Sequence, residues 1–304
     1  MLSKVFGALK GSSMLAHIIN GISLGSIYAI IALGYTMVYG IAKMLNFAHG
    51  DVIMVGGYVS FCSMMYLNIP APLSVLFAMI VCTLLGITIE GLAYRPLRQA
   101  TSLAVLITAI GMSYFLQNAA LLIWGANPKA YPDMFKGFDL TLMLGGARIS
   151  PVAIASILAN LIIMVALTLF TSRTKMGKAM RAVSEDRGAA TLMGINVNFT
   201  ISLTFAIGSG LAAIAGVLLC SAYPTLMPTT GSMPGIKAFT AAVFGGIGSI
   251  PGAFLGGILL GIIEALASGY ISMAWKDAIA FFVLIIILII RPTGILGERT
   301  ADKL

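Results

Sequence analysis

Charged side chains are scarce in this sequence. Asp, Glu, Lys and Arg together make up 9% of its 304 residues, whereas a soluble domain carries roughly 25%. Hydrophobic residues make up 59% of the chain, and so few charges cannot form a water-facing surface around them. Lipid must therefore replace water around most of the chain, which excludes an ordinary soluble domain.

Side chains that hold metals or form disulfides are equally rare. His17 and His49 are the only histidines, which excludes a histidine-rich metal site. The three cysteines, Cys62, Cys82 and Cys220, all lie inside apolar runs. We interpret them as small, reduced hydrophobic residues and expect neither a disulfide framework nor a bound metal.

No motif for nucleotide chemistry occurs in the sequence. A phosphate-binding loop has the pattern Gly-x-x-x-x-Gly-Lys-Ser/Thr, whose backbone N–H groups hold the phosphates. Here Gly177-Lys178 is followed by Ala179, and the upstream glycine is missing. We therefore expect a protein that is not an enzyme and needs no cofactor, and whose energy comes from elsewhere.

The charges that are present have a biased sign and place. Lys and Arg number 18 against 10 Asp and Glu, a formal net charge of +8. The cations fall in short segments between apolar runs, which is the positive-inside pattern of membrane proteins. We therefore expect a lipid bilayer around this chain and no nucleic acid as a partner.

The apolar runs are long enough to cross a bilayer as helices, because a hydrocarbon core of about 30 Å needs roughly 20 residues. One run is too long for a single span and is interrupted by Gly245, Gly246, Gly248 and Pro251, where we expect a helix break. The sequence thus predicts an all-α polytopic membrane protein, one domain over residues 1–304, with eight full spans and one short one. The full spans are expected at 15–42, 46–67, 71–94, 102–124, 151–172, 199–222, 253–273 and 277–290, and the short one from 236 to the break.

The orientation follows from the cations in the loops. The segment 173–198 contains Arg173, Lys175, Lys178, Arg181 and Arg187. We predict that 173–198 is a cytoplasmic loop, with Lys43, Arg95 and the tail from Arg291 on the same side. The stretch 125–150 then lies in the periplasm, and so does the N-terminus.

The stretch 125–150 has some pattern of its own. Phe138, Leu140 and Leu142 alternate with polar residues, and Gly145-Gly146 offers a two-residue turn. A small hairpin lid is one interpretation, and an irregular loop is the other.

A short similarity hints at an internal repeat. Residues 22–24 and 201–203 both read Ile-Ser-Leu ahead of a helix rich in small residues. The predicted topology runs these two spans in opposite directions, and inverted repeats are common in transporters. A shared tripeptide leaves both a repeat and chance open.

Few polar or ionisable residues fall inside the predicted spans, and such residues are expensive in a bilayer. Asn46, His49, Gly50 and Asp51 lie at the inner start of the second span, where Asn46 can cap the helix and Gly50 permits close packing. They form either a polar turn at the mouth of a pathway or a helix cap at the membrane interface. Glu264 lies in the middle of a span and must face protein or water, either in a pathway or in a bond between helices.

The predicted cytoplasmic loop contains a short helix. Ser184 can cap its start, Glu185 and Asp186 suit the positive end of a helix, and Gly194 suits its stop. The small residues Ala189 and Ala190 lie between. Such a helix can dock in a groove of another protein, or it can be a solvated linker.

The residues 188–194 (GAATLMG) resemble the EAA loop of bacterial ABC importer permeases, in which Glu-Ala-Ala and a later Gly form the coupling helix. Gly188 stands in place of the usual Glu, which puts the role of that side chain in doubt. Three further segments are similar to the branched-chain amino acid permeases of these importers, the LivH/LivM family, and most of all to its LivH type. They are 35–51 (YTMVYGIAKMLNFAHGD), 244–252 (FGGIGSIPG) and 291–297 (RPTGILG).

This resemblance spans nearly the whole chain and implies a permease in the bacterial inner membrane. It implies leucine, isoleucine or valine as substrate. It also implies a second, homologous permease subunit, two ATP-binding subunits and a periplasmic substrate-binding protein. The main alternative is an ion-coupled transporter, which would need buried carboxylates for the coupling ion.

Overall fold

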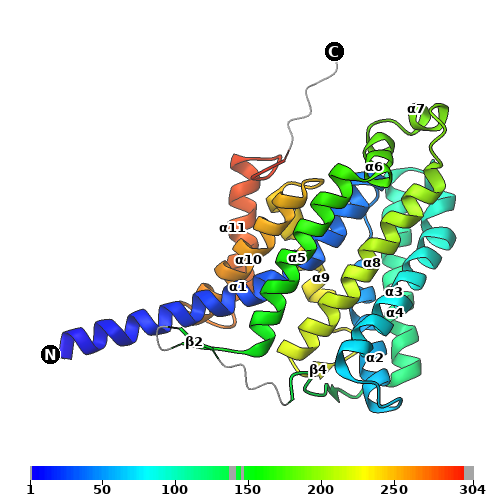
Figure 1. Cartoon of the computed structure of the whole chain (residues 1–304). Helices are drawn as coiled ribbons and strands as arrows, with labels where there is room; N and C mark the ends of the chain where they lie inside the picture. The colour runs from blue at the N-terminus through cyan, green and yellow to red at the C-terminus, as the bar shows by residue number, and fades with distance from the viewer. Residues whose placement is uncertain (1, 137–141, 145–146, 298–304) are drawn as a thin grey trace.

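The computed structural model describes residues 2–136, 142–144 and 147–297, a bundle of long helices with short strands at one end (Figure 1). The chain begins with α1 (Leu2–Ala42), α2 (His49–Met65), α3 (Ala71–Ile89), a π-helical turn η1 (Glu90–Tyr94), a 3-10 turn η2 (Arg95–Leu97) and α4 (Ser102–Trp124). It continues with β1 (Lys129–Ala130), β2 (Leu142–Leu144), β3 (Ala147–Ile149), α5 (Pro151–Arg173), α6 (Lys175–Glu185) and α7 (Arg187–Leu192). The remaining elements are α8 (Val197–Ala222), β4 (Thr225–Leu226), α9 (Ser232–Gly245), α10 (Ile250–Tyr270) and α11 (Lys276–Ile290). The predicted helical class is confirmed.

Six helices in the described ranges are long and apolar enough to cross a membrane. They are Met14–Ala42, Ala71–Leu97, Ser102–Trp124, Pro151–Arg173, Val197–Ala222 and Ile250–Tyr270. The expected count of eight full spans is not confirmed. The helices α2, α9 and α11 have 17, 14 and 15 residues, which is fewer than the roughly 20 that a span needs.

The core of the bundle lies around α8. This helix packs against α1, α2 and α3, and its side chains Ile201 and Phe205 are fully buried. By contrast, α4 and α5 expose many apolar side chains, among them Phe115, Leu122 and Ile162. In a helix bundle surrounded by lipid, we expect a central helix that is buried on all sides and outer helices that expose apolar faces. The structure has this arrangement.

Glycines set the contact between α1 and α10. A Cβ added to Gly21 would lie 2.8 Å from the Cα of Ile262, and one on Gly25 would lie 2.7 Å from the Cα of Ile258. Neither position has room for a larger residue. Small residues of this kind let membrane helices approach closely where hydrophobicity no longer drives association.

The cation-rich segments gather at one end of the bundle. Figure 1 shows α6 and α7 at the top, together with the end of α1. The Arg187 guanidinium donates to the carbonyl of Ala42, and Arg98 donates to the side chain of Asn198. The short strands lie at the opposite end (Figure 1), where Lys129 of β1 pairs with Leu226 of β4.

Of the two interpretations of 125–150, the structure agrees with the hairpin rather than with an irregular loop. Strand β2 pairs with β3 in antiparallel fashion, with Leu144 opposite Ala147. The predicted turn at Gly145-Gly146 and the alternating residues Phe138 and Leu140 lie outside the described residues.

The predicted helix break is confirmed between α9 and α10. Gly246 and Gly248 have φ angles of +108° and +95°, values that favour glycine. Helix α9 ends at Gly245, and Pro251 stands in the first turn of α10. The tail closes over this break, because the N–H of Leu296 donates to the carbonyl of Gly245 at 2.9 Å.

Candidate functional site

Helix α2 begins inside the bundle rather than at its end. After α1 ends at Ala42, the chain turns at Lys43, where φ is +54°, and returns without helix until His49. The His49 ring lies against Gly34 of α1 and near Gly208 of α8. Gly34 is about two helical turns before the end of α1, so α2 begins roughly 12 Å inside the bundle. This inner start explains why α2 is shorter than the predicted span.

Helix α9 begins beside the start of α2. A Cβ on Gly50 would lie 2.8 Å from the carbonyl oxygen of Gly231, and one on Gly235 would lie 2.8 Å from the Cα of Gly50. From this contact α2 runs to the strand end of the bundle, and α9 runs about 21 Å to the α6–α7 end. The positive ends of both helix dipoles therefore meet inside the bundle. We call the residues around this meeting point, Gly50, Asp51, Gly231, Ser232 and Gly235, the helix-start junction.

A polar cluster lies at the helix-start junction. The Nε2 atom of Gln117 on α4 donates to Asp51 Oδ1 at 2.9 Å. The same nitrogen lies 3.2 Å from Ser232 Oγ and 3.3 Å from Ser113 Oγ. Asp51 is only 1% exposed, whereas Gln117 is half-buried. The cluster thus joins α2, α4 and α9 through side-chain hydrogen bonds.

The His49 side chain occupies a tight slot. It is buried, and neither ring nitrogen has a hydrogen-bond partner among the residues that the structure describes. The ring of Tyr35 lies against it, with the two centroids 4.6 Å apart. His49 therefore acts here as a packed aromatic ring between α1 and α8.

The prediction that Asn46 caps α2 is wrong. The residue before α2 is Ala48, which makes no side-chain cap. Asn46 is buried, and its Oδ1 accepts a hydrogen bond from the Tyr94 hydroxyl at 2.9 Å. The returning segment is thereby attached to η1, and a cap at α2 would have required Asn46 to lie two residues later.

A second polar cluster surrounds Glu264 of α10. Its carboxylate accepts from Lys237 of α9 at 2.9 Å, from Tyr28 of α1 at 3.0 Å and from Lys276 at 3.2 Å. Lys237 also bonds Asp277 at 2.7 Å. Glu264 thus faces protein, as expected, and bonds four helices together. We call these five residues the Glu264 network.

Sequence reasoning missed several members of the two clusters. Lys237 stands in an apolar run, and a lysine there is itself a signal of a buried partner. Gln117 and Ser232 carry no such signal, because neutral polar residues are common in membrane helices and only the fold brings these two together. Within the described parts of the chain, no group of three His, Cys, Asp or Glu residues could hold a metal ion.

The loop 173–198 contains two helices, α6 and α7, rather than one. Ser184 is not a cap, because it lies within α6 and its Oγ donates to the carbonyl of Arg181. The cap is Asp186, whose Oδ1 accepts from the N–H groups of Gly188 and Ala189 at 2.7 and 3.0 Å. Glu185 is the last residue of α6. An aspartate at this place competes for backbone N–H groups and ends one helix while it begins the next.

The two alanines of α7 have different surroundings. Ala190 is buried within its own chain, whereas Ala189 is exposed. The exposed surface of this loop also includes Leu192 and Met193, which are 90% and 81% exposed. Gly194 then ends the loop helix with φ of +79°. In this structure Ala190 packs within the permease itself, and the exposed apolar residues of the loop are Leu192 and Met193.

Residues 17–288 match the family described as "Branched-chain amino acid transport system / permease component". The chain belongs to this family of permeases. It is 47% identical to the high-affinity branched-chain amino acid transport permease BraD of Pseudomonas aeruginosa, over 95% of this chain and 97% of that protein. It is 46% identical to the corresponding permease LivH of Escherichia coli K12, with the same coverage. The autoinducer 2 import permease LsrC of an Enterobacter strain is 33% identical, over 88% of this chain and 78% of that protein.

The matched region of this permease includes both polar clusters and the loop helices. Residues 17–288 contain the helix-start junction, the Glu264 network and both helices of the loop 173–198. These features are therefore part of the permease domain itself.

Proposed function

We propose that this chain is the membrane-spanning permease subunit of a bacterial ABC importer for leucine, isoleucine and valine. One observation carries the proposal: over nearly its full length the chain is 46–47% identical to permeases named for high-affinity branched-chain amino acid transport. The likeness to the autoinducer 2 permease is much lower. A neutral amino acid with an apolar side chain also suits a bundle with so little charge inside the membrane.

In this proposal α7 is the coupling helix. Its apolar residues Leu192 and Met193 project from the end of the bundle where α6 and α7 lie (Figure 1), and they would enter a groove on an ATP-binding subunit. Arg187 of the same helix bonds the last carbonyl of α1. A movement of α7 would thus reach α1 directly, and through it the returning segment that leads to α2.

The rest of the machine follows from the family. Two ATP-binding subunits would supply the energy, a second homologous permease would complete the pathway, and a periplasmic binding protein would deliver the amino acid. The bundle would lie in the inner membrane with 173–198 in the cytoplasm and 125–150 in the periplasm. The cation-rich end of the structure supports this orientation.

The assignment is tested by uptake. In a strain without a parallel system, deletion of this chain is expected to abolish uptake of leucine at low concentration, while uptake of lysine and glutamate persists. Adding the chain back restores it. Leucine uptake that is unchanged in the deletion strain would overturn the proposal, and restored uptake of autoinducer 2 instead would point to the other substrate class.

A further inference from the structure

Asp51 differs from the other buried carboxylates of the bundle. Glu90 is paired with Arg98, and Glu264 is paired with Lys237 and Lys276. Asp51, 1% exposed, has no cationic partner within residues 2–136 and 147–297. A buried charge is costly unless it is paired, and the side chains that hydrogen-bond Asp51, the Gln117 amide and the Ser113 hydroxyl, are both neutral.

Three oxygen atoms converge on one point beside Asp51. They are Asp51 Oδ1, Ser232 Oγ and Ser113 Oγ, at 2.9, 3.2 and 3.3 Å from Gln117 Nε2. The two serine hydroxyls can accept as well as donate, and the Ser113 hydroxyl is itself hydrogen-bonded to the Asp51 carboxylate. An ammonium group at this point would offer three N–H donors and a full positive charge. It would thus supply the opposite charge that the neutral Gln117 amide lacks.

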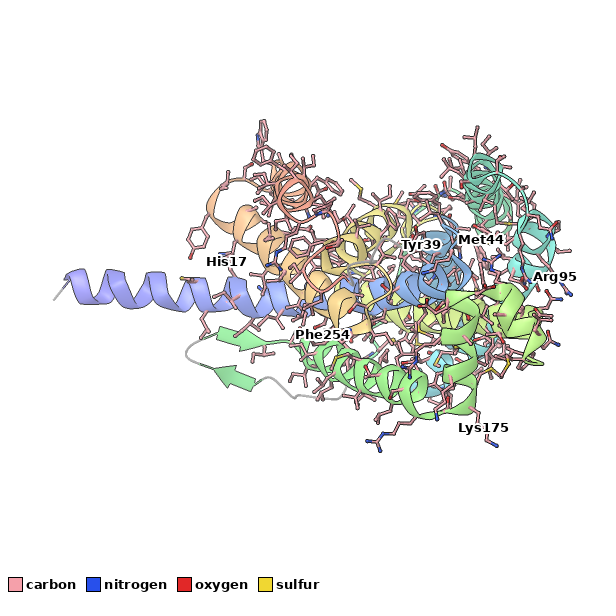
Figure 2. All side chains as sticks on the ribbon, turned by 90° about the horizontal axis from the view of Figure 1, so that it is seen from above. His17, Tyr39, Met44, Arg95, Lys175 and Phe254 are labelled. Carbon is pink, nitrogen blue, oxygen red and sulfur yellow. The ribbon has the colours of Figure 1, made fainter. Side chains whose placement is uncertain are left out.

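The cluster is open to one side through residues that suit an apolar amino acid. Gln117 and Ser232 are both half-buried. Ile236 lies four residues after Ser232, hence on the same face of α9, and it is 48% exposed. In the view from above, α9 lies between α4 and α11 on one side of the molecule (Figure 2). Gln117 is half-buried whereas Asp51 is 1% exposed, so the amide is the more accessible of the two groups.

We propose that Asp51, Ser113 and Ser232 bind the α-ammonium group of the transported amino acid, after the Gln117 amide moves aside. The apolar side chain of the substrate then lies along α9 at Ile236. This inference rests on the proposed function and names a substrate site within it. Since the three groups belong to α2, α4 and α9, the bound ammonium joins helices that start or pass at the helix-start junction.

The test uses the complete importer, with its binding protein, in proteoliposomes. Asp51→Asn keeps the shape of the side chain and removes its charge. We expect its leucine transport to fall at least about tenfold, the loss of one charge-assisted hydrogen bond, while ATP hydrolysis is still stimulated by the loaded binding protein. Asn118→Ala is the matched control on α4 and should transport like the wild type. Asn118 is exposed, and among the described residues its side chain bonds only the Tyr114 carbonyl of its own helix.

A binding measurement identifies the ammonium itself. Leucine should raise the unfolding temperature of the purified wild-type importer, whereas 2-hydroxy-4-methylpentanoate, which carries a hydroxyl in place of the ammonium, should not. The shift with leucine should be absent in Asp51→Asn. Should that variant fail to assemble, the Ser113→Ala/Ser232→Ala double variant leaves the carboxylate and Gln117 in place, and it is expected to raise the KM for leucine at least about tenfold.

The outcomes separate the site from the function. If the wild-type importer neither transports leucine nor responds to a leucine-loaded binding protein, the proposed function fails. If the wild type transports leucine, and either Asp51→Asn or the double-serine variant does so with unchanged KM and rate, the function stands and the ammonium site is wrong. Equal stabilisation of the wild type by leucine and its hydroxy analogue would also overturn the site.

Discussion

At the scale of single residues, the permease depends on places where only glycine fits. Gly34 is the clearest case, because a Cβ there would lie 2.5 Å from Nε2 of His49. His49 is 1% exposed, and the Tyr35 ring also lies against it, with the two centroids 4.6 Å apart. The start of α2 is therefore positioned by the absence of a side chain on α1.

We predict that Gly34→Ala destabilises the permease by about 1–3 kcal/mol, the usual cost of overpacking a core. The measurement is the unfolding temperature of the purified importer. Gly111→Ala on α4 is the matched control, because a Cβ at Gly111 meets nothing within 4 Å, and it should be neutral or stabilising by up to about 1 kcal/mol. A Gly34→Ala protein as stable as the control would show that His49 moves freely.

The polar residues show what a sequence can and cannot predict at this scale. His49, Asp51 and Glu264 were found because charge and polarity are rare inside apolar runs. Their partners were not found, since Gln117 is 66 positions from Asp51 in the chain. The error at Asn46 has a local cause: a residue that often caps helices was read as a cap, whereas its partner Tyr94 lies on η1.

At the scale of elements, the Glu264 network holds α1, α9, α10 and α11 together. Removing one member of a buried ion pair leaves the other charge uncompensated and costs about 3–5 kcal/mol. For Lys237→Met we predict a smaller loss, because Lys276 still contacts Glu264 at 3.2 Å. The Lys237→Met/Glu264→Gln double variant should recover much of it, since one charge of each sign has then been removed. The unfolding temperatures of Lys237→Met, Glu264→Gln and the double variant give the coupling energy between the two side chains. If the stability losses of the two single variants simply add in the double variant, the network is contradicted.

The short helix α7 carries the next prediction at this scale. Leu192→Glu or Met193→Glu places a charge on the exposed apolar pair and should leave the permease at normal levels in the membrane. Leucine transport and stimulated ATP hydrolysis should both be lost, because the ATP-binding subunits dock poorly. Lys136→Glu, at an exposed position of the opposite end, is the control.

Ala190→Trp should act differently from these two substitutions. Ala190 is buried within the chain itself, so the larger side chain disturbs the packing of α7 on the permease and lowers the amount of folded protein. Full stimulation of ATP hydrolysis in Leu192→Glu would contradict the assignment of α7 as the coupling helix. Normal stability of Ala190→Trp would contradict its burial.

The helices themselves were largely predictable, and their ends less so. The bounds of α4 agree with the sequence, because Thr101 caps its start through a bond from the N–H of Ala104, and Gly125 ends it with φ of +84°. The span count was not predictable from hydropathy. Both α2 and α9 begin inside the bundle, and each reaches only one of its ends. A count of apolar residues cannot distinguish such a partial crossing from a full one.

At the scale of the whole molecule, the cations give the bundle two unlike ends. Arg187 bonds the last carbonyl of α1, and Arg98 bonds Asn198 shortly after α7. Both belong to the end with α6 and α7, and the strands mark the other end (Figure 1). In a bacterial inner membrane this asymmetry sets the orientation, since loops with many Lys and Arg residues stay in the cytoplasm. In the proposed orientation α7 would lie where ATP is available, and the hairpin β2–β3 would lie on the side from which a periplasmic binding protein would deliver the amino acid.

Site-directed labelling tests the orientation. The three native cysteines, Cys62, Cys82 and Cys220, are replaced by alanine, and one new cysteine is introduced at either Leu192 or Lys136, both of which are exposed. In intact cells, a membrane-impermeant thiol reagent is expected to label Lys136→Cys and not Leu192→Cys. In inverted membrane vesicles the result should reverse. A leucine uptake assay on both variants serves as the control that the labelled protein is folded. Labelling of Leu192→Cys in intact cells would place α7 outside, where no ATP-binding subunit can reach it, and would overturn the orientation and the coupling role together.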